Sequence, residues 1–136
     1  MRRPSASTNA DPALVVASLV SELEWQRTVT ETAELLGWWV WHDRDSRTNA
    51  PGMPDLLLIH PGQGRVLFVE LKREGKHLRS AQADVIRRLI EFPALECYVL
   101  SPSDKDTMTV ILQGAAFPFA LRRQAMVAEI EHAGWV

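Results

Sequence analysis

The sequence predicts an α/β fold in which helices pack on one mixed β-sheet. Short apolar runs rich in β-branched and aromatic residues, which are typical of strands, alternate with longer segments whose apolar residues recur at helical spacing. Two of the short runs flank the tetrapeptide PGQG, a pattern typical of a hairpin. The expected elements, in the order α-β-β-β-α-β-α, are a helix over 11–37, strands over 38–42, 55–60 and 65–71, a helix over 81–92, a strand over 96–100 and a helix over 118–132.

Local signals place the ends of these elements. Asp11 can cap the first helix with Pro12 at its first position, and Gly37 can terminate it. Ser80 can cap the helix that follows the hairpin, and the segment 101–104 (SPSD) opens a further capped element after the last strand. The sequence therefore predicts helices before, between and after the strands, packed on a single sheet.

The composition is typical of a globular protein. The 136 residues suit one domain, which we expect over 11–136 behind a flexible tail over 1–10. No apolar run approaches the roughly 20 residues of a membrane helix, and no signal peptide follows the first two arginines, so we expect a cytoplasmic protein. Cys97 is the only cysteine, which excludes internal disulfides and cysteine-based zinc sites. It lies in an apolar run and is expected in the core.

Two carboxylates and a lysine gather on the predicted hairpin. Glu70 and Lys72 are two apart on one strand and therefore share a face. If the turn is centred between Gly62 and Gln63, Asp55 lies directly opposite Glu70, with the two Cβ atoms about 5 Å apart. Carboxylates this close repel when both are ionised, and a proton or a hard divalent cation relieves the repulsion. We favour the cation, because a lysine stands beside the pair and apolar residues flank it.

The same residues suggest phosphodiester hydrolysis. Asp55, Glu70 and the backbone carbonyl of Leu71 can hold Mg²⁺ against a phosphate oxygen, where the metal neutralises charge and acidifies water. Lys72 can orient the attacking water and stabilise the transition state. The alternative is a surface Glu–Lys pair beside an unrelated aspartate at a strand end, and spacing by itself does not decide between the two.

Basic residues surround this hairpin although the net charge of the chain is −2. A DNA-binding surface is one interpretation, and a solvated basic face is the other. The residues that we assign to DNA binding are Arg73, Lys76, Arg79, Arg87 and Arg88, together with Arg44, Ser46 and Arg47 in the loop before the hairpin.

The strand over 38–42 holds three tryptophans. Trp39 and Trp41 alternate with Val40, so that the strand has one face carrying both rings and one carrying Val40. We expect one face to pack in the core. A stacking platform for bases is a less favoured interpretation of the tryptophans.

The ordered motifs resemble the PD-(D/E)xK nuclease superfamily, and within it the VRR-NUC family. The residues that carry the resemblance are Gly-x-Pro-Asp at 52–55, Glu-Leu-Lys at 70–72, Gln82 near the start of a helix, and SELEWQ at 21–26 with its helical glutamates. The loop over 41–55 is similar to that of small stand-alone members, many of them phage-encoded, which would place the protein in a host cytoplasm.

This resemblance implies a restriction-endonuclease-like sheet and a role for each matching residue. Asp55 and Glu70 match the family's metal ligands and Lys72 its catalytic lysine, with Mg²⁺ or alternatively Mn²⁺ as the ion. Gln82 matches a glutamine near the active site that helps to position Lys72 or the phosphate. Its alternative role is an N-terminal helix residue that binds backbone.

A glutamate of the first helix is the remaining implied metal ligand. Glu22 and Glu24 point about 200° apart around a helix, so only one of them can face the sheet. Gln26 lies four residues after Glu22 and shares its face, and we therefore choose Glu22.

The implied activity is a DNA endonuclease, which we expect to act on branched DNA in the manner of Holliday junction resolvases. Two symmetric cuts favour a homodimer, for which the apolar segment 114–136 offers an interface. The alternatives are a general or nicking nuclease and a non-catalytic DNA-binding module. We expect neither a membrane association nor an organic cofactor.

Overall fold

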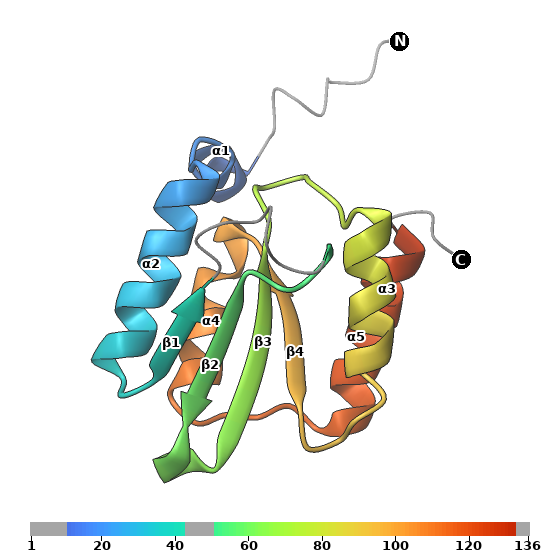
Figure 1. Cartoon of the computed structure of the whole chain (residues 1–136). Helices are drawn as coiled ribbons and strands as arrows, with labels where there is room; N and C mark the ends of the chain where they lie inside the picture. Colours follow the sequence, from blue (N-terminus) through green and yellow to red (C-terminus); the bar gives the residue numbers. More distant parts are fainter. Residues whose placement is uncertain (1–10, 43–50, 133–136) are drawn as a thin grey trace, which may run out of the picture.

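The computed structural model describes residues 11–42 and 51–132, which form a four-stranded sheet between helices (Figure 1). The helices are α1 Pro12–Ser18, α2 Glu22–Leu35, α3 Ser80–Leu89, α4 Lys105–Leu112 and α5 Phe119–His132. The strands are β1 Trp39–His42, β2 Leu56–His60, β3 Arg65–Leu71 and β4 Glu96–Leu100. Two short 3₁₀ turns are η2 Pro61–Gln63 and η3 Pro102–Asp104. The predicted α/β class with a mixed sheet is confirmed.

The sheet has the strand order β1-β2-β3-β4, in which β1, β2 and β3 run antiparallel and β4 is parallel to β3. Leu56 pairs with Val69 and Leu58 pairs with Leu67. This is the register predicted from a turn centred between Gly62 and Gln63, so the hairpin prediction is confirmed. Parallel pairing of β4 requires a crossover, which α3 supplies.

One face of the sheet is covered by α2 and α4. Trp25, Val29 and Ala33 of α2 pack in one buried cluster with Leu58 and Leu67 of the sheet. The indole N–H of Trp25 donates to the backbone carbonyl of Leu100 at 3.0 Å. Its polar edge is thus satisfied inside the core, and the start of α2 is tied to the end of β4.

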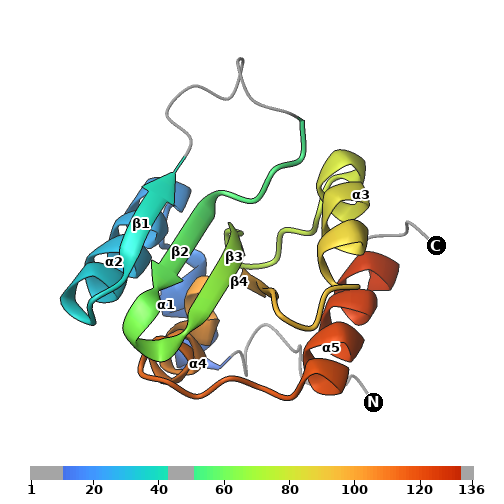
Figure 2. The ribbon, with the colours of Figure 1, turned by 60° about the horizontal axis from the view of Figure 1, so that its bottom comes forward.

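The opposite face is covered by α3 and α5 over β3 and β4 (Figure 2). Ile86 of α3 and Met126 of α5 pack in a second buried cluster with Cys97 of β4, and Phe68 of β3 packs against it. Cys97 is buried as expected, and burial raises the pKa of its thiol to about 12. The sheet is therefore enclosed on both sides at its β3–β4 half.

The prediction of one helix over 11–37 is wrong, because the chain forms two helices. Helix α1 ends at Ser18, and Ser21 begins the second by accepting a hydrogen bond from the backbone N–H of Glu24 at 3.1 Å. Ser-x-x-Glu is the sequence signature of such a cap. The order of elements also differs from the prediction by α4, which the capped segment 101–104 opens, and α3 ends at Leu89 rather than at residue 92.

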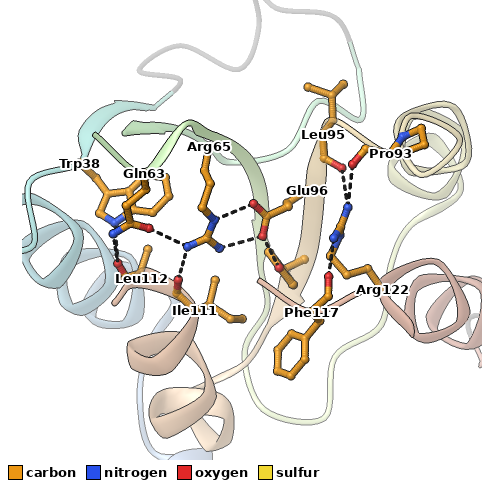
Figure 3. Close-up of polar contacts among 11 residues, drawn as sticks. Trp38, Gln63, Arg65, Pro93, Leu95, Glu96, Ile111, Leu112, Phe117 and Arg122 are labelled. Atoms are coloured by element: carbon orange, nitrogen blue, oxygen red, sulfur yellow. Dashed lines mark hydrogen bonds and ion pairs between the residues drawn. The ribbon is translucent and has the colours of Figure 1, made fainter. Parts of the chain in front are cut away.

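A buried polar network ties β3 to β4 and α4 (Figure 3). Arg65 donates two hydrogen bonds to the carboxylate of Glu96, both 2.8 Å, and one to the carbonyl of Ile111 at 2.7 Å. The Glu96 partner raises the pKa of Arg65. Burial by itself would raise the pKa of Glu96, but hydrogen bonds from Arg65 and Tyr98 outweigh it and the pKa is lowered. Arg65 is thus a structural cation and not part of an exposed basic surface.

Several sequence-based expectations lie outside the described residues. They are the flexible tail over 1–10, the DNA-binding roles of Arg44, Ser46 and Arg47, and the end of the proposed dimer segment beyond residue 132. Within the described parts of the chain, no helix is long and apolar enough to cross a membrane.

Candidate active site

Four of the predicted site residues meet where β2 begins and β3 ends: Asp55, Glu70, Lys72 and Gln82. Asp55 directly precedes β2, and Glu70 lies in β3 one residue before its end. The carboxylate oxygen Oδ2 of Asp55 accepts the backbone N–H of Leu71 at 2.8 Å. This bond takes the place of a main-chain pair at the open end of the hairpin and fixes the Asp55 carboxylate against β3.

Glu70 is buried, with an exposed fraction of 1%. Its Oε1 accepts a hydrogen bond from the amide Nε2 of Gln82 at 2.9 Å and lies 3.9 Å from the ammonium Nζ of Lys72. Its Oε2 is buried and has no hydrogen-bond partner among the described residues. A buried carboxylate oxygen without a partner is costly, which marks Oε2 as a position for a ligand.

The environment of Glu70 raises its pKa to about 9. Burial is the main cause and the nearby Asp55 carboxylate adds to it, while Lys72 and Arg79 oppose the shift. At neutral pH Glu70 therefore holds a proton unless another positive charge replaces it. A divalent cation between Asp55 and Glu70 would supply this charge, and Mg²⁺ commonly binds proteins through one or two carboxylates. The donor set and the unpartnered oxygen both fit such an ion.

Gln82 joins this site to the start of α3. Besides donating to Glu70, it accepts the backbone N–H of Arg79 on its Oε1 at 2.9 Å. Gln82 therefore binds the backbone, which was its alternative role, and it also orients a carboxylate of the site. Its positioning of Lys72 or of the phosphate stays a prediction. Because both ends of its amide are engaged, Gln82 holds Glu70 Oε1 in one position and leaves Oε2 available.

Gly52 has a structural role that the sequence reading did not assign. Its φ is +85°, and a Cβ built on it would lie 2.1 Å from the carbonyl oxygen of Ala81 in α3. Only glycine permits both this conformation and this approach of two backbones. The contact packs the segment before Asp55 against the first turn of α3, beside Gln82. The glycine of Gly-x-Pro-Asp is the signal that marks this contact.

The structure does not bring Glu22 to the carboxylate pair. Glu22 and Glu24 are both exposed, and the side of α2 that faces the sheet carries Trp25 and Val29 instead. The backbone N–H of Lys72 and the indole of Trp25 both donate to Leu100, so α2 begins at the same end of the sheet as the site, but on its other face.

Within residues 11–42 and 51–132, no three His, Cys, Asp or Glu side chains cluster as metal ligands. The metal-binding roles of Glu22 and of the Leu71 carbonyl stay predictions.

The basic residues assigned to DNA binding after the hairpin are exposed: Arg73, Lys76, Arg79, Arg87 and Arg88. Arg79 lies close enough to Glu70 to lower its pKa. Asp84 forms an ion pair with Arg87 at 3.0 Å and accepts a hydrogen bond from Arg88 through its backbone carbonyl. The basic cluster therefore extends from the site along α3, where Asp84 neutralises part of its charge.

A mixed sheet with two carboxylates, a lysine and a glutamine gathered at the end of a hairpin defines a restriction-endonuclease-like domain. The family model described as the VRR-NUC domain matches residues 13–101, which include all of these site residues. The chain belongs to the VRR-NUC family.

A solved structure described as a VRR_NUC domain agrees with this assignment. It is 30% identical to this chain, with a TM-score of 0.54, over 66% of this chain and 92% of the other. A search of curated proteins gives no match. Membership supports a nuclease-type function in DNA processing, and nucleases of this family generally depend on divalent metal ions.

Proposed function

We propose that this chain is a Mg²⁺-dependent DNA endonuclease that hydrolyses phosphodiester bonds. The observation that carries the proposal is the buried carboxylate of Glu70, which has a raised pKa and an unpartnered Oε2 beside Asp55. A buried carboxyl group with a raised pKa beside a second carboxylate is typical of a functional site, and a hard cation between the two would relieve their repulsion. Mn²⁺ is the alternative ion.

Asp55 and Glu70 would hold the metal, with the backbone carbonyl of Leu71 as a further oxygen ligand. When bound, the ion would neutralise charge on the phosphate and make the attacking water more acidic. Hydrogen bonds hold both carboxylates in place for metal binding. The Leu71 N–H donates to Oδ2 of Asp55, and the Gln82 amide donates to Oε1 of Glu70. Fixed ligands reduce the reorganisation that metal binding requires.

Lys72 would act on the phosphate and the water. Its ammonium group lies 3.9 Å from Glu70 Oε1, and its side chain is 12% exposed, so it is held at the site and remains accessible. An ammonium group at this position can donate to the attacking water and to the oxygens on which charge develops in the transition state. Replacing Lys72 should therefore affect the chemical step more than DNA binding.

For the substrate we propose branched DNA cut by a homodimer. The support is the likeness of small stand-alone members of the family to junction resolvases, because two sites on a two-fold axis match the symmetry of a junction. The C-terminal segment uses Met126 and Ile130 to pack on its own domain, while Phe117 and Leu121 are 40% and 55% exposed. These two exposed side chains are available to a partner subunit.

The test compares end-labelled four-way junction, flap, blunt duplex and single-stranded DNA, each with Mg²⁺ and with a chelator. We expect cleavage only with Mg²⁺, and fastest on the junction. Equal rates on all substrates would leave a general or nicking nuclease, and no cleavage of any substrate would leave a DNA-binding module. Light scattering of the protein with and without junction DNA tests the dimer, which a monomer in both samples would rule out.

A further inference from the structure

One half of the sheet carries two exposed tryptophans. Trp39 and Trp41 of β1 are 55% and 38% exposed, although large aromatic side chains are usually buried in a domain of this size. Val40, between them, points the other way and packs against the core beneath α2. The two rings therefore share the opposite face of β1, on the side of the sheet to which α3 and α5 belong.

This face is open over β1 and β2. Trp39 pairs with Ile59 and Trp41 with Leu57, and Leu57 in turn pairs with Phe68 of β3, which packs in the α3–α5 cluster. In Figure 2, α3 and α5 lie on the β4 side of the sheet, and none of the described helices lies over β1 and β2 on this face. Among the described residues, the two rings thus lie on a part of the face that no helix covers, and the same face carries Glu70.

The tryptophans are adjacent to the carboxylate pair. Asp55 precedes Leu57 by two residues, and Leu57 is the direct partner of Trp41. Residues in this diagonal relation across antiparallel strands lie about 7–8 Å apart. Trp41 is therefore the neighbour of the site, and Trp39 lies about 7 Å further along β1.

We propose that Trp39 and Trp41 form a stacking surface for unpaired bases of the DNA strand whose phosphate lies at Asp55 and Glu70. The inference rests on the proposed function, because it assumes that DNA reaches the carboxylate pair. A DNA strand whose phosphate lies at this site can extend along two paths. One path crosses the β1–β2 half of the sheet, and the other follows α3. On the first path the DNA strand meets two exposed aromatic faces, on which any base can stack.

The geometry selects unpaired bases over duplex. In a B-form duplex each base face is covered by its neighbours at a step of about 3.4 Å, and only base edges are accessible in the grooves. The two tryptophans are about twice this step apart. They therefore suit bases that have been drawn out of the stack, as in a flap, an overhang or the centre of a junction. This preference identifies the substrate class more narrowly than the metal site does.

The test measures binding without cleavage. Fluorescence anisotropy in a chelator buffer gives the Kd of the wild type and of Trp41→Ala for a 3′-flap, a 5′-flap and a blunt duplex of the same sequence. We expect Trp41→Ala to weaken flap binding roughly tenfold and to leave the duplex unchanged. Trp41→Phe should retain most of the affinity, and Leu35→Ala, a control at an 87% exposed apolar residue at the end of α2, should retain all of it.

A double-mutant cycle identifies the base as the contact. Abasic sites in the flap should weaken wild-type binding as much as Trp41→Ala does, and should weaken Trp41→Ala no further. Trp39→Ala combined with Trp41→Ala should leave the molar mass by light scattering unchanged. Equal losses of affinity for duplex and flap, or additive losses in the cycle, would overturn the inference. A fall in molar mass would also overturn it, because it would show that this face joins two copies of the chain.

Failure of the proposed function has a different signature. The anisotropy measurement needs neither metal nor cleavage, so a protein that binds flaps through Trp41 but never cuts DNA would support the stacking surface and refute the nuclease. A protein that cuts DNA with Mg²⁺ but binds flap and duplex alike would support the nuclease and refute the stacking surface.

Discussion

Replacing Glu70 by glutamine should make the metal-free protein more stable, although it removes a residue of the site. Glutamine keeps an oxygen that can accept the hydrogen bond from Gln82, and it cannot ionise. In the wild type the same buried position, next to Asp55, must become charged as the pH rises. The substitution thus removes an unfavourable ionisation while the packing is retained.

The sign and size of the effect follow from the pKa of Glu70, which is 4.5 as a reference and about 9 in the folded protein. Below pH 4.5 the carboxyl is protonated in both states and has no effect on stability. Between the two values the unfolded state releases its proton first, so wild-type stability falls by about 1.4 kcal/mol per pH unit. At pH 7 the loss is on the order of 3 kcal/mol, which corresponds to roughly 10 °C in Tm.

Thermal melts in a chelator buffer between pH 5 and pH 9 measure this difference. We expect Glu70→Gln to melt above the wild type by a margin that grows with pH, and Glu34→Gln, at an exposed position of α2, to follow the wild type. With saturating Mg²⁺ the margin at pH 7 should nearly close, because an ion present at 100 times its Kd adds about 2.7 kcal/mol to the wild type only. Parallel pH profiles of wild type and Glu70→Gln would refute the reasoning.

Three further substitutions test the parts of the site. Asp55→Asn should abolish the rise in Tm that Mg²⁺ gives the wild type, since it removes one of the two carboxylates; an unchanged response would place the metal elsewhere. Gln82→Ala should lower stability by about 1–3 kcal/mol in urea titrations, because it leaves Glu70 and the Arg79 N–H without a partner, whereas a loss below about 0.5 kcal/mol would contradict this role. Gly52→Ala should lower the free energy of unfolding by about 1–3 kcal/mol or more, because alanine is strained at this positive φ. It should also slow DNA cleavage by moving Asp55. Full activity in the folded variant would show that the contact with α3 does not position the site.

The hairpin and its site were predictable from the sequence because local rules decide them. The apolar runs at 56–59 and 66–69 mark the two strands, and a turn centred in the short PGQG connection fixes their register. That register places Asp55 beside Glu70, and a spacing of two puts Lys72 on the same face. Each step depends on neighbours in sequence or on one turn, so no knowledge of the helices was needed.

The division of the first helix was predictable in principle but was missed. The apolar spacing continues through residues 19–21 and predicts one continuous helix, although Ser21 and Glu24 form a capping signature. The structure resolves the conflict in favour of the cap, with Ser21 bonded to the Glu24 N–H. Local hydrogen bonding of a serine competes with helix continuation, and the periodicity of apolar residues carries no information on it.

Contacts between distant elements could not be predicted from spacing. The side of α2 that faces the sheet depends on how Trp25 packs and bonds to Leu100, and this packing leaves Glu22 in solvent. The approach of Gly52 to Ala81 joins segments about 30 residues apart. The resemblance to the VRR-NUC family supplied Gln82, whose hydrogen bond to Glu70 no spacing argument gives.

The rate of DNA cleavage by Lys72→Ala tests the central claim most directly, namely that Lys72 completes a metal-dependent hydrolytic site with Asp55 and Glu70. The matched control is Lys105→Ala, an exposed lysine at the start of α4 that belongs to neither the site nor the basic cluster. With labelled substrate and Mg²⁺, we predict that the wild type and Lys105→Ala cleave at rates within a few-fold of one another. Lys72→Ala should lose more than about tenfold, or at least 1.4 kcal/mol of transition-state stabilisation, with unchanged Kd for DNA. Lys72→Ala cleaving as fast as Lys105→Ala would contradict the account.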